Sequence, residues 1–195
     1  GLEANTEYFY RVTNTSGDTL GGRFITAAAA GERVGLTFGV SGNWRGEVTP
    51  YPAIRNIPDR NLDFFVALGD TVYADDESPA VLNPDGTQKA QAETIEEFRA
   101  KHNEVYSDRF GENFWLEARG STSILSSIDD HEVTNDFQGG ADASTDDRFV
   151  ETSGFINDTH LYENGLQAFQ EYNPLRDEFY DAPGNDLFDN ERKLY

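Results

Sequence analysis

Cysteine is absent from this chain of 195 residues, and positive charge is scarce. Without cysteine there are no disulfide bonds, thiolate ligands or cysteine nucleophiles, so any bound metal must be held by oxygen and nitrogen atoms. The chain has only 15 Lys and Arg residues but 36 Asp and Glu residues, which gives a formal net charge of -21. Such a charge opposes general binding to nucleic acid or to anionic membranes.

Long apolar runs are absent as well. None approaches the roughly 20 residues that a membrane-spanning helix requires, so we expect no transmembrane segment. Hydrophobic residues still make up 37% of the chain and aromatic residues 13%, which is enough for a folded core. The acidity is explained either by solubility, for instance in a salty medium, or by a bound metal that draws an anionic substrate to the protein.

The first thirty residues have the pattern of a strand pair followed by a linker. Tyr8, Tyr10 and Val12 alternate with polar residues, and residues 20–27 can form the returning strand. Tyr8 also lies in a pattern that suggests the tyrosine corner of immunoglobulin-like sandwiches. Because two strands cannot make a sandwich, we interpret residues 1–30 as the last strands of an immunoglobulin-like β domain whose earlier part precedes this chain.

The remaining residues, 31–195, predict an α/β domain with a mostly parallel sheet and flanking helices. Apolar segments that resemble buried strands alternate with segments of helical periodicity. We expect strands over residues 34–40, 62–68 and 121–128. We expect helices starting at Pro52, after a capping box at Thr94 and Glu97, over 114–119 and over 161–172, with acidic loop sequence at 181–191.

Polar clusters follow each of the three predicted strands. Ser41 and Asn43 follow the first, Asp70 the second, and Asp129, Asp130 and His131 the third. In a parallel sheet the carboxyl ends of the strands meet at one edge, where ligands collect. Carboxylates that crowd together are stable when a cation lies between them. The sequence therefore predicts a metal site at this edge.

Further candidate ligands lie close to these clusters. Tyr73 follows Asp70 by one short turn, and a phenolate ligand requires a strongly Lewis-acidic metal such as ferric iron. Asn43 and Asn135 offer neutral oxygen atoms suited to a hard cation. Each residue also has a structural interpretation: Tyr73 can simply pack, His131 can be structural, and Asp129 can cap a turn.

A structural interpretation applies to Glu132 and His102, and His160 is left open. Glu132 is expected to face solvent. His102 lies on an apolar helical face together with Ile95, Phe98 and Val105, so we expect it to be packed or solvated rather than catalytic. For His160, beside Asp158, both structural and functional roles stay open.

Three segments together resemble one enzyme family. "SGNWRG", "DFFVALGDTVYAD" and "SIDDHEVTND", in this order, resemble the alkaline phosphatase D (PhoD-like) branch of the metallophosphoesterases, and "GLQAFQEYNPLR" and the closing "RKLY" resemble its downstream helix and next strand. The resemblance covers nearly the whole chain. It implies a secreted, periplasmic or cell-surface phosphomonoesterase or phosphodiesterase with an iron and calcium centre, continuing beyond Tyr195.

The resemblance also implies roles for individual residues. Asp70 is expected to bridge two metals, and Tyr73 to ligate ferric iron. Asp130 and Asn135 are expected to be further metal ligands, and His131 to assist the leaving group or stabilise the phosphoryl oxygens. One departure is Ser41, which stands where the family commonly has cysteine. A hydroxyl is a poorer ligand for ferric iron than a thiolate, so calcium or another divalent ion becomes an alternative to iron.

The sequence thus predicts a metal-dependent phosphoesterase, expected to be monomeric, in which a metal-activated water attacks phosphorus and His131 assists departure of the leaving oxygen. The alternative is a non-catalytic calcium-binding module or an inactive phosphatase homologue, whose acidic loops hold ions structurally. The alternative predicts metal-dependent stability without turnover.

Overall fold

The computed structural model describes residues 1–151, 153–173, 175, 179–180 and 191–192. Most of the predicted acidic loop at 181–191 and of the closing "RKLY" lies outside these residues. The chain forms two compact units. One contains Gly1–Ser41, Pro50–Ala67 and Tyr106–Leu125; the other contains Gly42–Thr49, Leu68–Val105 and Ser126–Tyr195.

The first unit begins with an antiparallel hairpin of β1 (Glu7–Thr13) and β2 (Thr19–Ile25). Tyr8 lies opposite Phe24, and their ring centroids are 5.8 Å apart. The Tyr8 hydroxyl accepts a hydrogen bond from the backbone N–H of Glu3 at 2.8 Å, which is the upstream tie expected of a tyrosine corner. Assignment of residues 1–30 to an immunoglobulin-like domain stays a prediction.

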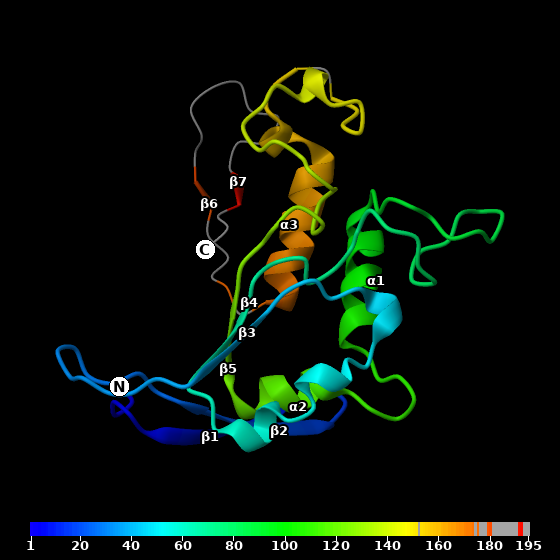
Figure 1. Ribbon diagram of the computed structural model, residues 1–195. Coiled ribbons are helices and arrows are strands. Elements are labelled where there is room, and N and C mark those ends of the chain that lie inside the picture. The colour runs from blue at the N-terminus through cyan, green and yellow to red at the C-terminus, as the bar shows by residue number, and fades with distance from the viewer. Residues whose placement is uncertain (152, 174, 176–178, 181–190, 193–195) are drawn as a thin grey trace. The chain divides into compact units, whose positions relative to one another are not determined.

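A three-stranded parallel sheet follows, in the order β3-β4-β5 (Figure 1). Its strands are β3 (Phe38–Ser41), β4 (Phe64–Ala67) and β5 (Ser123–Ser126). On one face, Phe65 packs edge-on against Trp115 of α2 (Phe114–Ser121), with ring centroids 6.0 Å apart. The predicted α/β class is therefore confirmed.

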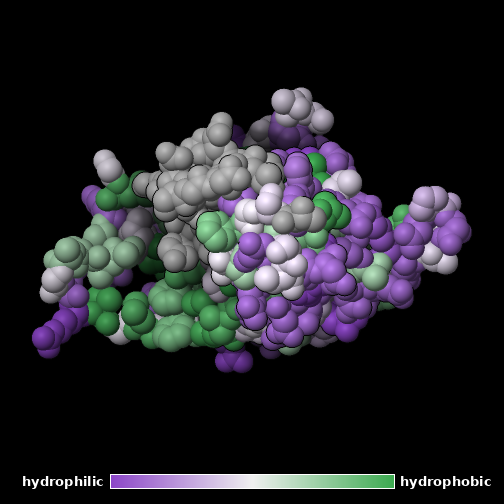
Figure 2. All heavy atoms as spheres, turned by 90° about the horizontal axis from the view of Figure 1, so that it is seen from above, coloured by the Kyte–Doolittle hydropathy of each residue, from purple (hydrophilic) through white to green (hydrophobic). Residues whose placement is uncertain are grey.

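The opposite face of this sheet carries apolar side chains that are not buried. Phe65 and Ala67 of β4 are buried, but Phe64 and Val66, which alternate with them, are only half-buried. The expectation that residues 62–68 form a buried strand is therefore met on only one face of β4. Phe38 and Val40 on the neighbouring strand are exposed. In Figure 2, apolar residues, coloured green, gather on part of the face of the molecule that is drawn.

The second unit is built around α1 (Ile95–Tyr106) and α3 (His160–Tyr172), with a two-residue ladder of β6 (Phe179–Tyr180) and β7 (Glu191–Arg192). Figure 1 shows the two helices, and Arg99 joins them through two 2.7 Å hydrogen bonds to Glu171. His102 is buried and stacks on Tyr172 at 4.8 Å. Of the two structural positions expected for His102, packed or solvated, the structure shows the packed one.

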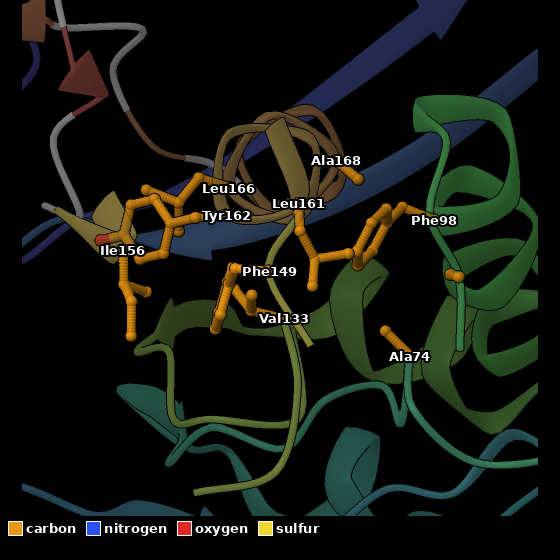
Figure 3. Packing of buried hydrophobic residues seen from close by; sticks show 10 residues of the cluster. Ala74, Phe98, Val133, Phe149, Ile156, Leu161, Tyr162, Leu166 and Ala168 are labelled. Carbon is orange, nitrogen blue, oxygen red and sulfur yellow. The ribbon is translucent and has the colours of Figure 1, made fainter. Parts of the chain in front are cut away.

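An apolar core lies between these helices and the loops beside them (Figure 3). Figure 3 shows Phe98 of α1 beside Leu161 and Ala168 of α3, and Val133, from the loop after β5, belongs to the same core. The predicted capping box begins α1: Thr94 accepts from the Glu97 N–H at 3.3 Å, and Glu97 accepts from the Thr94 N–H at 3.2 Å. This core holds the loops that carry the site.

The helix predicted from Pro52 is wrong. The segment forms two 3₁₀ turns, η2 (Pro52–Ile54) and η3 (Ile57–Arg60), in place of an α-helix. Pro58 has no backbone N–H and cannot donate the i→i−4 hydrogen bond to the Ile54 carbonyl that a continuous α-helix requires, which interrupts the pattern. Three further 3₁₀ turns are η1 (Gly46–Val48), η4 (Ala143–Thr145) and η5 (Ile156–Asp158). Among the described residues, no helix is long and apolar enough to cross a membrane.

Candidate metal site

Two loops of the second unit meet where the polar clusters lie, one following β4 and the other following β5. Gly69 has a φ of +89°, and a Cβ built on it would lie 2.6 Å from Cβ and N of Asp129. Only glycine fits this approach. The next residue, Asp70, also has a left-handed backbone, with φ of 51°. The turn therefore brings Asp70 against the Asp129–His131 segment, as the sequence predicted.

Asp70, Asp130 and His131 form a cluster that can hold a metal ion, because one potential ligand atom from each lies within 4.8 Å of the others. Asp70 is only 6% exposed, and its Oδ1 atom is buried without a hydrogen-bond partner among the described residues. A buried carboxylate oxygen without a donor is costly, and a cation removes that cost. The residues present therefore fit a metal.

Asn43 and Tyr73 complete the surroundings of Asp70. The Asn43 side-chain amide donates to Asp70 Oδ2 at 2.6 Å and to the Tyr73 hydroxyl at 2.9 Å. The Tyr73 hydroxyl lies 3.3 Å from the same Asp70 oxygen. The structure thus brings Asn43 together with Asp70 and Tyr73, which lie 27 and 30 positions further along the chain. Their roles as ligands stay predictions.

His131 is oriented by a carboxylate that the sequence analysis missed. Its Nδ1 atom lies 2.7 Å from Asp75 Oδ1, while the other Asp75 oxygen accepts the Asn135 backbone N–H at 2.6 Å. The His131 ring stacks on Tyr73 with centroids 4.1 Å apart. The available signal was the repeated aspartate in "GDTVYADD", where Asp75 follows Asp70 by five positions.

The electrostatic surroundings suit a cation. Burial raises the pKa of Asp70 above 3.8, the charges of Asp129 and Asp130 raise it further, and His131 lowers it. Burial lowers the pKa of His131, but the hydrogen bond that it donates to Asp75 and the charges of the surrounding carboxylates outweigh this and raise the pKa above 6.5. A positive ion in this position stabilises the ionised carboxylates that repel one another here.

For Asp130, burial raises the pKa, but the hydrogen bond from the Asp136 backbone N–H and the charge of His131 outweigh it, so the pKa lies below 3.8. Asp130 is therefore the member of the cluster whose surroundings most favour a permanent negative charge. Permanent charge is what a carboxylate ligand of a hard cation requires.

The remaining predicted residues have varied positions. Asp129 is exposed, and the Asn135 side chain donates to Asp136 at 2.9 Å. Ser41 is the last residue of β3 and belongs to the first unit. His160 begins α3 and pairs with Glu151 at 2.6 Å. The expectation that Glu132 faces solvent is wrong, because this side chain is fully buried.

Comparison with known proteins supports the resemblance. A family model described as "PhoD-like phosphatase" matches residues 37–192. A solved structure titled "Structure of PhoD" matches the fold with a TM-score of 0.72 and 22% sequence identity. That match covers 100% of this chain but only 35% of the solved chain. No curated protein matches the sequence.

Proposed function

Because the chain belongs to the PhoD-like phosphatase family, we propose that its second unit contributes a metal-dependent centre for hydrolysis of phosphate mono- or diesters. This chain spans only 35% of the solved chain that it matches. The activity of the whole protein is therefore also part of the proposal. The supporting observation is the buried Asp70 oxygen without a hydrogen-bond partner among the described residues, within a cluster that also contains Asp130 and His131.

Asp70 and Asp130 would hold the cation, with Tyr73 and Asn43 beside them. When bound, the cation supplies positive charge for the phosphate oxygens and acidifies water, which is the general chemistry of metal-dependent hydrolysis. Oxygen donors suit calcium, whereas a tyrosine phenolate suits ferric iron. Both ions are kept as proposals, and Ser41 in place of the family's cysteine weighs against iron.

His131 is proposed to assist the leaving group. Water adds to phosphorus, the ester P–O bond breaks, and the departing oxygen takes up a proton. Asp75 occupies Nδ1 of His131 at 2.7 Å, so Nε2 is the nitrogen that can donate a hydrogen bond or a proton to the departing oxygen. The same imidazole can instead be a metal ligand, since it belongs to the metal cluster.

The test uses the longest natural polypeptide that contains this sequence, assayed on aryl phosphate mono- and diesters with and without a chelator. We expect hydrolysis that chelation abolishes and that Asp70→Asn lowers strongly, because the metal that activates water loses a ligand. The matched control is Asp108→Asn, an exposed aspartate of the first unit, which should retain activity.

Two results would count against this function. Hydrolysis that survives thorough removal of metal would exclude a metal-dependent mechanism. Metal-dependent thermal stability without any turnover would instead support the non-catalytic calcium-binding alternative.

Export to the periplasm, cell surface or medium is also proposed, on the family resemblance, and cell fractionation tests it.

A further inference from the structure

Glu132 lies between the two loops that form the candidate metal site, and its side chain is 0% exposed. Its Oε1 atom accepts the backbone N–H and the hydroxyl of Thr71, at 2.6 and 2.8 Å. Its Oε2 atom accepts the backbone N–H of Asp129 at 2.9 Å. We propose that Glu132 is a positioning residue that clamps the two loops together and so sets the spacing of the metal ligands. This inference rests on the proposed function of the same site.

The clamp acts on the residues next to the ligands. Thr71 directly follows Asp70, and Asp129 directly precedes Asp130. Fixing these two backbone amides therefore limits how far the Asp70 and Asp130 carboxylates can separate. The backbone contributes another link between the loops, from the Ala74 N–H to the His131 carbonyl at 2.9 Å.

Helix α3 holds Glu132 from the other side. A Cβ built on Gly165 of this helix would lie 2.7 Å from the Glu132 carbonyl oxygen and 3.0 Å from Val133 Cγ2. The backbone of the loop thus lies directly against the helix, and the Glu132 side chain extends between the loops. Since α3 belongs to the apolar core, the spacing of the ligands is tied to the packed part of the second unit.

The three hydrogen bonds require a carboxylate of this length. Glutamine has one acceptor oxygen, so its NH₂ group must face either the Thr71 N–H or the Asp129 N–H, and that donor loses its acceptor. Aspartate is shorter by one methylene group and cannot reach both loops in the same backbone position. Glu132→Gln therefore preserves volume and removes the clamp.

A purely structural role is the competing explanation, and Asp158 provides a matched control. Asp158 is also buried, at 1% exposure, and its Oδ2 atom accepts the backbone N–H of Phe155 at 2.8 Å. It lies in the same unit but is not part of the metal cluster. Asp158→Asn therefore makes the same carboxylate-to-amide change without touching the site.

The experiment compares wild type, Glu132→Gln and Asp158→Asn in the longest natural polypeptide that contains this sequence. Binding of terbium(III), a luminescent probe for calcium sites, is titrated at a temperature where all three proteins are folded. Melting temperature and turnover are measured in parallel. We expect Glu132→Gln to weaken terbium binding about 10- to 100-fold, as is typical when a residue that supports metal ligands is changed. Asp158→Asn can keep the bond from the Phe155 N–H through its amide oxygen, because the other Asp158 oxygen has no partner among the described residues, and it should leave terbium binding unchanged.

Terbium affinity equal to wild type in Glu132→Gln would overturn the clamp, also when the melting temperature of this variant is lowered. Equal loss of terbium affinity in both variants would overturn it too, because general destabilisation would then explain the effect. Thr71→Val removes one of the three hydrogen bonds and should weaken binding less than Glu132→Gln. Wild-type protein that binds terbium but hydrolyses no phosphate ester would count against the proposed function and leave the clamp intact.

Discussion

Replacing Asp75 by asparagine tests how His131 works. The substitution keeps the shape of the side chain but leaves one acceptor oxygen where the structure uses two. Asp75 accepts from His131 Nδ1 at 2.7 Å and from the Asn135 N–H at 2.6 Å. Asparagine can keep only one of these, and it removes the negative charge that stabilises a protonated His131.

The size of the effect follows from the bond that is lost. A hydrogen bond to a charged group contributes about 1.5–3 kcal/mol. At about 1.4 kcal/mol per factor of ten, its loss lowers kcat by about 10- to 150-fold. The loss should fall on substrates whose leaving oxygen needs a proton, such as alkyl phosphates. Hydrolysis of 4-nitrophenyl phosphate, whose leaving group is stable as an anion, should change much less.

The assay measures kcat and KM for a series of phosphate esters with leaving groups of different basicity. The control is Asp76→Asn, an adjacent aspartate that pairs with Arg45 and should leave the series unchanged. An equal loss for all substrates, together with lost metal, would show that Asp75 supports His131 as a metal ligand. Full activity of Asp75→Asn on alkyl phosphates would refute the reasoning altogether.

Three further outcomes are expected. If Tyr73 ligates ferric iron, the iron-loaded protein is violet and Tyr73→Phe bleaches it; a colourless, fully active protein without iron by elemental analysis would contradict this. Burial raises the pKa of Glu97, but the hydrogen bonds that it accepts from the Glu93 and Thr94 N–H groups and from Lys89 outweigh this, so the pKa lies below 4.5. The ionised Glu97 therefore stabilises the folded protein at neutral pH. This stabilisation is lost as the pH falls through the pKa of Glu97 in the folded state. Glu97→Gln should therefore cost about 1 kcal/mol at pH 7 and progressively less below pH 4.5 in denaturant titrations. Residues 1–195 alone should hydrolyse phosphate esters more slowly per mole than the longest natural polypeptide; equal turnover at equal metal content would contradict this.

The sequence by itself determined where the chemistry gathers. Asp70 follows one apolar strand and Asp130 the next, and strands of a parallel sheet end at one edge, so their meeting could be predicted without coordinates. The α3 helix and the capping box of α1 were predictable for a similar reason. Helical periodicity and a Thr-x-x-Glu pattern are local signals, readable within a few residues.

Only the tertiary structure decided how these residues are held. Asp75 and His131 are 56 positions apart, and Glu132 is 61 positions from Thr71, so neither hydrogen bond has a local signal. Glu132 was expected in solvent because charged residues are rarely buried unless paired, and two of its three hydrogen bonds come from Thr71 of the other loop. The close approach at Gly69 and at Gly165 creates that buried position. Local sequence specifies which groups reach the edge of the sheet, whereas the packing of loops and helix α3 specifies which of them touch.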